Sequence, residues 1–541
     1  MQADIIIGGR ILTMGPQGTV EAVAITGGAI TAVGSLEDVG RFRGSDTEMI
    51  DMAGQVLMPG LIEPHSHPDM CGVCYSWLDV SGFNHRSDAE VEAALRGEAA
   101  RRPDGEWIFA FGLDAMLTGD LGTYDRHRLD DISPANPMVV MIQSMHTLWV
   151  NSAALSAAGL SDDSPDPEFA GSYGRDAAGH LTGRVEEQAA MLPFLIHADM
   201  SPDLLETQMW RQYQRYADVG ITTLGLAGAT VPTASFDLFQ KFADRDDVPQ
   251  RVVGYLRHNE VEAIGLSPGD GDDKFKVQGV KLWYDGSPYT GTMLVDDPYL
   301  ETDLCCCTLG IAPGTTGYAN FDPNDLVEIL SGLAADGWQV LTHAQGDRGC
   351  REILDLYEVA LGAASARDHR WRLEHCLLIA DDDLARARAI GVSPSFHVDH
   401  VHWYGPELRD QILGAERSER IMPIHDALEH GHRVSLHADS PMYPPGPLHL
   451  ARTAATRLTR MGDRVGAAQA ISVEQALRAV TIDAAWQLRV EDDVGSIEVG
   501  KHADFVVLDD DPLQVSPEDI DKIGISGTWL GGKPVSGRDI T

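Results

Sequence analysis

Residues 59–67 read Pro59-Gly60-Leu61-Ile62-Glu63-Pro64-His65-Ser66-His67, an apolar segment that leads directly into a His-x-His pair. On a β-strand, residues two apart point to the same face, so the imidazoles of His65 and His67 would aim at one point. Two neutral imidazoles at the end of a strand can bind a divalent metal ion, whereas the competing interpretation is a pair of surface histidines. The pair alone leaves both interpretations open.

Four later segments share this arrangement, with a polar residue at the end of an apolar, strand-like run. They are Val280–Trp283 with Lys281, Leu341–Ala344 with His343, Leu373–Cys376 with His375, and Leu436–Pro441 with Asp439. A bare ammonium group inside an apolar strand, as at Lys281, would be costly. Polar residues at the carboxyl ends of buried parallel strands are typical of the active sites of (β/α)8 barrels. The repetition favours one shared site over five unrelated structural roles.

The spacing of these segments predicts an α/β fold with a (β/α)8 TIM-like barrel. His375 follows His343 by 32 residues, which is about one βα unit. We assign strands 1, 4, 5, 6 and 8 to the segments that carry the His-x-His pair, Lys281, His343, His375 and Asp439. The 214 residues between His67 and Lys281 are too many for three plain units. This excess predicts a lobe inserted after strand 1, over about residues 75–210.

Both ends of the chain are predicted to contain strands without helices. Gly27-Gly28 and Gly531-Gly532 are two-residue hairpin signals between β-rich pieces. We therefore expect a small β-sandwich domain built from residues 1–58 and 491–541, with the barrel occupying residues 59–490 between them.

The composition limits the possible partners. Lys and Arg number 41 and Asp and Glu 82, so the formal net charge of −41 would repel nucleic acid and anionic membrane surfaces. No apolar run approaches the roughly 18 residues of a membrane span, and the first residues carry no signal-peptide pattern.

The seven cysteines, which include the Cys71-x-x-Cys74 pair, are expected to be reduced thiols of a cytoplasmic protein. We expect a small-molecule substrate and a homo-oligomer, with a dimer favoured.

Motifs along nearly the whole chain resemble the amidohydrolase superfamily, and within it the family 3 branch, which includes formamide deformylases. In order, they are Val56–His67, Trp149–Leu155, Thr182–Glu186, Gly220–Thr223, Val280–Ser287, Ala438–Pro441 and Gly495–Asp504. Each motif is modest alone, but the set in this order is highly specific. The resemblance implies a (β/α)8 barrel with a flanking β-sandwich and a metal-activated water.

The resemblance also implies a role for each residue at the strand ends. His65 and His67 would bind the more buried of two divalent metal ions, and His343 and His375 the second. Lys281, carboxylated by CO2, would bridge the two ions as an anionic carbamate. The alternative for Lys281 is a snorkelling or salt-bridged lysine in a one-metal site. Zn²⁺ is the favoured ion, although such ligands also suit Mn²⁺, Fe²⁺ and Co²⁺.

The expected chemistry is hydrolysis of a non-peptide C–N bond in an amide, N-acyl, formamide or cyclic amide. A hydroxide shared by the two ions would attack the carbonyl group, with Asp439, Lys281 and His375 as the catalytic residues. Asp439 would bind the first ion weakly, take the proton of the water and deliver it to the leaving nitrogen. Ester or lactone hydrolysis, decarboxylation or isomerisation at the same metal site stays open, because fold and ligands do not separate these reactions. A non-enzymatic relative would lack part of the ligand set, and all of its members are present here.

Other polar and aromatic residues are candidates for contact with the substrate. They are His146 and Trp149 in the lobe, Tyr284 after Lys281, and His397, His402 and Trp403 after a predicted strand 7 over Gly391–Ser395. His400 and His437 belong to the same neighbourhood of the sequence. Trp77, Trp149, Trp283 and Trp403 could line an apolar cavity, although packing in the core explains tryptophans equally well. The alternative for each histidine is a loop position without a direct role.

Overall fold

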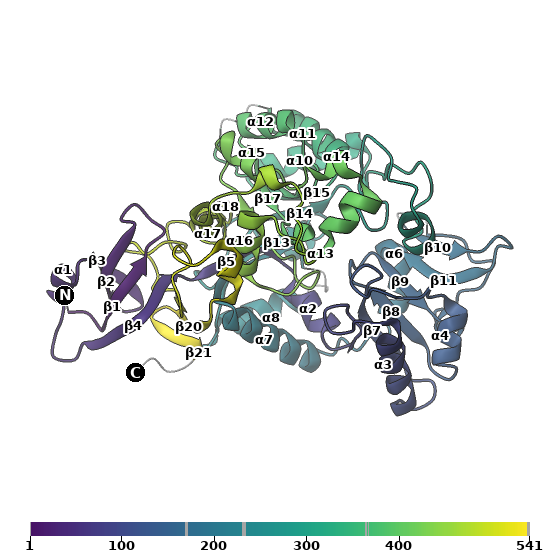
Figure 1. Cartoon of the computed structure of the whole chain (residues 1–541), viewed down its shortest axis with the longest axis horizontal. Helices are drawn as coiled ribbons and strands as arrows, with labels where there is room; N and C mark the ends of the chain where they lie inside the picture. The colour runs from purple at the N-terminus through teal and green to yellow at the C-terminus, as the bar shows by residue number, and fades with distance from the viewer. Residues whose placement is uncertain (1, 168–170, 230–233, 363–364, 366, 538–541) are drawn as a thin grey trace.

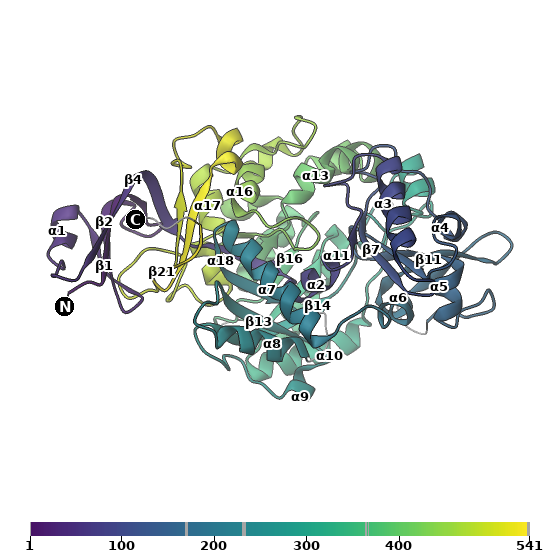
Figure 2. The ribbon, with the colours of Figure 1, turned by 90° about the horizontal axis from the view of Figure 1, so that it is seen from below.

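Three β-sheets organise the chain in the computed structural model, which describes residues 2–167, 171–229, 234–362, 365 and 367–537. The sheet built from both chain ends and the sheet of the inserted lobe lie at opposite ends of the molecule, with the barrel between them (Figures 1 and 2). Within these residues, no helix is both long and apolar enough to cross a membrane.

The central sheet consists of eight parallel strands in the order β18-β17-β16-β15-β14-β13-β12-β5. Their bounds are β5 Leu61–Ser66, β12 Ile221–Ala227, β13 Arg251–Arg257, β14 Phe275–Trp283, β15 Gln339–Ala344, β16 Arg372–His375, β17 Ser393–Phe396 and β18 Ser435–Leu436. The outermost strands meet where the backbone N–H of His67, just past β5, donates to the carbonyl oxygen of Ser440, just past β18 (3.0 Å). The predicted (β/α)8 barrel is confirmed.

The barrel strands are buried because both faces of the sheet are covered. Every residue of β5, β12, β15, β16 and β17 is buried. Helices cover the outside of the barrel, among them α7 Pro202–Asp218, α8 Ala234–Ala243, α10 Pro323–Asp336, α11 Asp347–Leu361, α12 Asp381–Ala389, α13 Asp399–Glu407, α15 Ile424–Glu429, α16 Pro447–Thr456, α17 Val473–Ala479 and α18 Ile482–Gln487. In α11, Ile353, Leu354, Tyr357 and Leu361 form a buried stripe at helical spacing.

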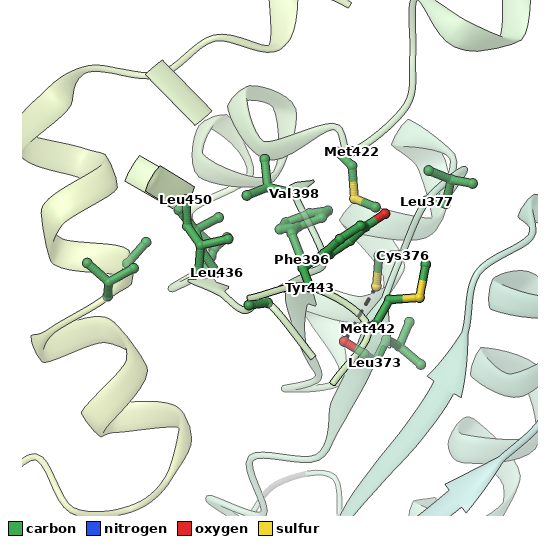
Figure 3. Packing of buried hydrophobic residues seen from close by; sticks show 14 of the residues in the cluster. Leu373, Cys376, Leu377, Phe396, Val398, Met422, Leu436, Met442, Tyr443 and Leu450 are labelled. Carbon is green, nitrogen blue, oxygen red and sulfur yellow. Dashed lines mark hydrogen bonds between the residues drawn. The ribbon is translucent and has the colours of Figure 1, made fainter. Parts of the chain in front are cut away.

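Part of the core lies where the last barrel strands meet α16. Figure 3 shows Leu373 of β16, Phe396 of β17, Leu436 of β18 and Leu450 of α16 close together. All four side chains are at most 1% exposed. This packing fixes three strand ends at which the polar residues Glu374, His397 and His437 directly follow Leu373, Phe396 and Leu436.

The two chain ends form one seven-stranded sheet in the order β21-β20-β19-β4-β1-β2-β3. Its strands are β1 Ile5–Leu12, β2 Thr19–Thr26, β3 Ala29–Gly34, β4 Glu48–Pro59, β19 Phe505–Leu508, β20 Ile525–Leu530 and β21 Lys533–Gly537. Gly27-Gly28 and Gly531-Gly532 turn two hairpins with positive φ, as expected. The two turns also meet, since an added Cβ on Gly28 would lie 3.0 Å from the carbonyl oxygen of Gly531. One apolar cluster joins strands from both halves, so the sheet folds over its own core.

The inserted lobe lies between β5 and β12 and contains a six-stranded sheet in the order β10-β11-β9-β8-β7-β6. Its strands are β6 Leu78–Asp79, β7 Ile108–Leu113, β8 Met138–Ile142, β9 Thr147–Val150, β10 Ser172–Arg175 and β11 Leu181–Glu186. Its helices are α3 Asp88–Arg101, α4 Arg126–Ile132, α5 Ser152–Ala157 and α6 Glu187–Leu195. This sheet accounts for the long interval between His67 and Lys281.

A buried ion pair joins the barrel to the terminal sheet. Arg251 of β13 donates to Asp504, one residue before β19, through Nε (2.7 Å) and a terminal nitrogen (3.2 Å). The two side chains are 9% and 2% exposed. Arg251 also contacts Asp273 (2.6 Å), whose side chain is 54% exposed.

We predict that Asp504→Ala lowers the free energy of unfolding by about 3–5 kcal/mol, because it leaves most of the Arg251 charge buried without its partner. The matched control Asp273→Ala removes only the solvent-exposed partner and should cost less than about 1 kcal/mol. Urea unfolding followed by tryptophan fluorescence measures both. Equal effects of the two substitutions would contradict the role assigned to the buried pair.

Candidate metal centre

The six residues expected to bind metal all lie at the carboxyl ends of barrel strands. They are His65 in β5, His67 as the residue before α2 (Pro68–Cys74), Lys281 in β14, His343 in β15, His375 at the end of β16, and Asp439 three residues after β18. Five of them are at most 7% exposed, and the Asp439 side chain is 14% exposed. The barrel therefore brings together residues that are up to 374 positions apart in the sequence.

Two imidazoles face the Asp439 carboxylate with their Nε2 atoms. The distances to Oδ1 are 3.2 Å from His67 and 3.5 Å from His65. Nδ1 of His67 lies 3.3 Å from the carbonyl oxygen of Gly228, so it carries the proton and leaves Nε2 as an acceptor. Burial, followed by the charge of Lys281, lowers the pKa of His65 well below its usual value. His65 is therefore neutral near pH 7.

Asp439 remains a carboxylate in this setting. Burial alone would raise its pKa, but the neighbouring His65 and His67 hold the pKa of Asp439 well below its usual range. Two imidazole lone pairs and a carboxylate oxygen thus converge on one point, and a divalent cation satisfies such a donor set. The residues present fit a metal ion on the chemistry of the donors alone.

His343 and His375 lie next to each other on the other side of Asp439. Their ring centroids are 4.2 Å apart, and Nδ1 of His375 is 3.8 Å from Asp439 Oδ2. Nε2 of His343 lies 3.2 Å from the carbonyl oxygen of Gly286, which leaves its Nδ1 as an acceptor. Burial and the charge of Lys281 lower the pKa of His343 to about 3.

Lys281 is completely buried beside the histidines. Its Nζ lies 3.1 Å from Nε2 of His65 and 5.2 Å from the centre of the Trp283 ring. Burial lowers the pKa of Lys281 to about 8, although the carboxylates of Glu374 and Asp439 favour the charged form. A fraction of this side chain is therefore a neutral amine near neutral pH.

Sequence reasoning missed the carboxylate that orients His65. Nδ1 of His65 donates to Glu374 Oε2, and Arg372 donates to both oxygens of Glu374 (2.7 and 2.9 Å). Arg372 and Glu374 lie two positions apart in β16 and are completely buried. Two oppositely charged residues two positions apart in a strand-like segment were the available signal, because such charges are buried only when they are paired.

Glu63, in the same segment as the His-x-His pair, is a second carboxylate of the centre that the sequence did not reveal. It is completely buried, and it accepts hydrogen bonds from the backbone N–H groups of His65 (3.4 Å) and Ala438 (3.2 Å). Burial raises the pKa of Glu63 well above its usual value. Its carboxyl group links β5 to the segment that carries Asp439.

Two further histidines extend the cluster. His437 stacks against His65 with 4.5 Å between ring centroids and against His397 with 4.8 Å. Nδ1 of His397 is 3.9 Å from Asp439 Oδ2. His397 was expected to contact substrate, and the structure places it directly at the metal centre.

Of the two expected lobe residues, His146 lies near the centre and Trp149 lines a cavity beside it. The charge of His146 lowers the pKa of His343, and Nδ1 of His146 is 3.1 Å from a Glu187 oxygen. Trp149 lines a cavity of about 120 Å³ between the lobe and the barrel, together with Gln143, Arg184 and Tyr289. Of the four tryptophans considered for an apolar cavity, only Trp149 lines this one, among the residues that the structure describes.

Three of the expected substrate contacts are not brought to the metal centre. The hydroxyl of Tyr284 donates to Glu352 of α11 (2.7 Å). Nδ1 of His402 lies 3.1 Å from the carbonyl oxygen of Leu458. Trp403 packs edge-on against Phe83, with 4.8 Å between ring centroids. Each side chain contacts another element of the fold. The position of a residue after a strand does not reveal such a contact.

A model described as the amidohydrolase family matches residues 48–536 of the chain. The match confirms the resemblance found in the sequence motifs.

The chain is similar to two further relatives and to one solved structure. An N-substituted formamide deformylase of Arthrobacter pascens is 26% identical, over 98% of this chain and 97% of that protein. The Arabidopsis thaliana protein LONG AFTER FAR-RED 3 is 27% identical, over 95% and 88% of the two chains. The crystal structure of an uncharacterised metal-dependent hydrolase from Pyrococcus horikoshii OT3 shares the fold, with a TM-score of 0.73, 23% identity, and coverage of 95% of this chain and 99% of that one. On the match over residues 48–536, this chain belongs to the amidohydrolase family.

Proposed function

We propose that this protein hydrolyses a non-peptide C–N bond in a small amide, N-acyl compound, formamide or cyclic amide. The observation that carries the proposal is the position of Asp439, whose Oδ1 faces Nε2 of His67 at 3.2 Å while its Oδ2 lies 3.8 Å from His375. A carboxylate between imidazoles at the mouth of a barrel suits metal-dependent hydrolysis. The similarity to an N-substituted formamide deformylase supports an amide or formamide as the substrate.

In this proposal the chain holds two divalent cations, with Zn²⁺ favoured. His65, His67 and Asp439 would bind the first, and His343, His375 and a carboxylated Lys281 the second. When bound, the cations would supply a water of lowered pKa as the nucleophile and would polarise the carbonyl group.

Asp439 acts as the general base. Its carboxylate is anionic because His65 and His67 lower its pKa. It takes one proton from the attacking water and later delivers that proton to the leaving nitrogen, so that an amine and a carboxylic acid are released. His146, on the lobe side of the centre, is positioned to donate a hydrogen bond to the substrate.

Lys281 becomes a carbamate by attack of its neutral amine on CO2, which forms an N–C bond and releases one proton. The pKa of about 8 provides that neutral amine. The product replaces a buried cation by an anion between metal ligands, and this charge is compensated by bound cations.

The first test replaces the base. We predict that Asp439→Asn lowers kcat for an N-substituted formamide by roughly 10²–10⁴-fold, while most of the bound metal remains on the histidines. The matched control is Asp383→Asn, which alters a buried carboxylate of α12 and should retain activity. Kinetics with metal analysis measure both effects. Full turnover by Asp439→Asn would refute the base, and turnover of only the matching formate ester would refute the C–N specificity.

A second prediction concerns the orientation of His65. Glu374→Gln removes the acceptor charge at His65 Nδ1 and should weaken metal binding about 10- to 100-fold. Competition with a chelator measures the affinity, and circular dichroism checks the fold, because Arg372 loses its paired charge. Glu352→Gln, which alters a carboxylate of α11 bound to Tyr284, is the control. Unchanged affinity in Glu374→Gln would contradict the orienting role.

A third prediction concerns Lys281. With ¹³C-bicarbonate, the wild-type chain should show a carbamate carbon signal by NMR that Lys281→Met lacks, because only the lysine amine can bond to CO2. Lys276→Met is the control, since this lysine also lies in β14 and has a pKa lowered by burial. The same signal in wild type and Lys281→Met would exclude the carbamate.

A further inference from the structure

His437 is a buried imidazole whose ring nitrogens have no hydrogen-bond partner among the residues that the structure describes. The side chain is 0% exposed, and neither Nδ1 nor Nε2 has a hydrogen-bond partner within the described part of the chain. A neutral imidazole carries one N–H donor and one acceptor, and leaving such a buried group unsatisfied costs roughly 1–3 kcal/mol. A buried histidine in this position requires an explanation other than packing.

Two neighbouring imidazoles turn towards the same point. The ligating nitrogens of His375, His397 and His437 all lie within 4.8 Å of one another. Nδ1 of His375 also has no hydrogen-bond partner among the described residues. Nε2 of His397 lies 3.0 Å from the carbonyl oxygen of Ala438, to which it donates, so its Nδ1 is an acceptor. All three side chains are at most 2% exposed.

The fourth group at this point is the Asp439 carboxylate. Its Oδ2 lies 3.8 Å from Nδ1 of His375 and 3.9 Å from Nδ1 of His397. The two oxygens of Asp439 therefore face two different histidine pairs, with Oδ1 towards His65 and His67. His437 also lies near Glu374 and His65, but Arg372 occupies both oxygens of Glu374.

We propose that His375, His397 and His437 form a cation site of their own, which takes a divalent transition metal such as Zn²⁺, Co²⁺ or Ni²⁺. Three imidazoles favour these ions over Mg²⁺ and Ca²⁺, which prefer oxygen ligands. We call this set the three-histidine site.

The three-histidine site shares His375 with the cation expected at Lys281 and His343. A neutral imidazole has a single lone pair, so His375 serves one of these two positions at a time. The three-histidine site contains neither Lys281 nor a carbamate, so it is the position available to a second cation when Lys281 is an amine. It does not rest on the proposed hydrolysis, because cation binding here requires no reaction.

The test counts cobalt ions without measuring activity. The full-length apoprotein is titrated with Co²⁺ in buffer free of CO2, and bound ions are counted by elemental analysis after gel filtration. Wild type should bind two ions per chain, and His437→Leu and His397→Phe should each bind one. Lys281→Met should still bind two. His432→Gln is the matched control and should bind two, because this buried histidine also makes a bond to a carbonyl oxygen through Nε2 (Leu384, 2.9 Å) but lies outside the cluster.

The outcomes separate this site from the one proposed for hydrolysis. Two ions in both His437→Leu and His397→Phe, or a single ion in Lys281→Met, would overturn the three-histidine site. A single wild-type ion that His67→Asn removes and His437→Leu retains would overturn it as well, while leaving the His65–His67–Asp439 site intact. Anomalous scattering from wild-type crystals grown with Co²⁺ in CO2-free buffer, where Lys281 stays an amine, is independent of any variant. A peak among the three rings supports the proposal, and a peak only beside His343 and Lys281 refutes it.

Discussion

The metal centre depends on the seam where the first and last barrel strands meet. Asp439 reaches His67 only because the backbone N–H of His67 donates to Ser440 (3.0 Å) and the N–H of Ala438 donates to Glu63 (3.2 Å). Both bonds lie beside the residues that carry the chemistry. Closure of the barrel and assembly of the site are therefore the same event, and neither end of the chain can form the site alone.

Buried charged residues set the orientation of the side chains in the centre. Arg372 and Glu374 are completely buried inside the barrel, where charges are tolerated only as a well-bonded pair. The pair leaves Glu374 able to accept a hydrogen bond from Nδ1 of His65, and this fixes which nitrogen of His65 faces Asp439. The buried Arg372–Glu374 ion pair therefore sets the orientation of the His65 ring in the site.

The sequence predicted the position of a residue well where the geometry of a strand sets the direction of its side chain. Residues 59–67 and the polar ends of four later strands predicted the barrel and the residues that meet at its mouth, because parallel strands end at one edge. The strand β13, Arg251–Arg257, was not predicted from the sequence, although it ends in a charged residue next to Lys281 of β14. Tyr284 could not be placed, because it lies beyond the end of β14 and its direction is set by Glu352, 68 residues later. The sequence places His437 in the neighbourhood of the site, but only the structure shows that neither ring nitrogen has a hydrogen-bond partner among the described residues.

The inserted lobe is joined to the segment after Asp439 by hydrogen bonds to its backbone. The side-chain amide of Gln143 donates to the carbonyl oxygens of Pro441 (3.1 Å) and Met442 (2.6 Å), in the segment that directly follows Asp439. Gln143 also lines the cavity between lobe and barrel, as does Tyr289, whose hydroxyl lies 2.7 Å from His400. The ring of His400 in turn lies 4.2 Å from that of His397, at the edge of the metal centre. A molecule held in this cavity would therefore contact Gln143, which also holds the segment after Asp439, so occupation of the cavity and the position of Asp439 are linked through this side chain.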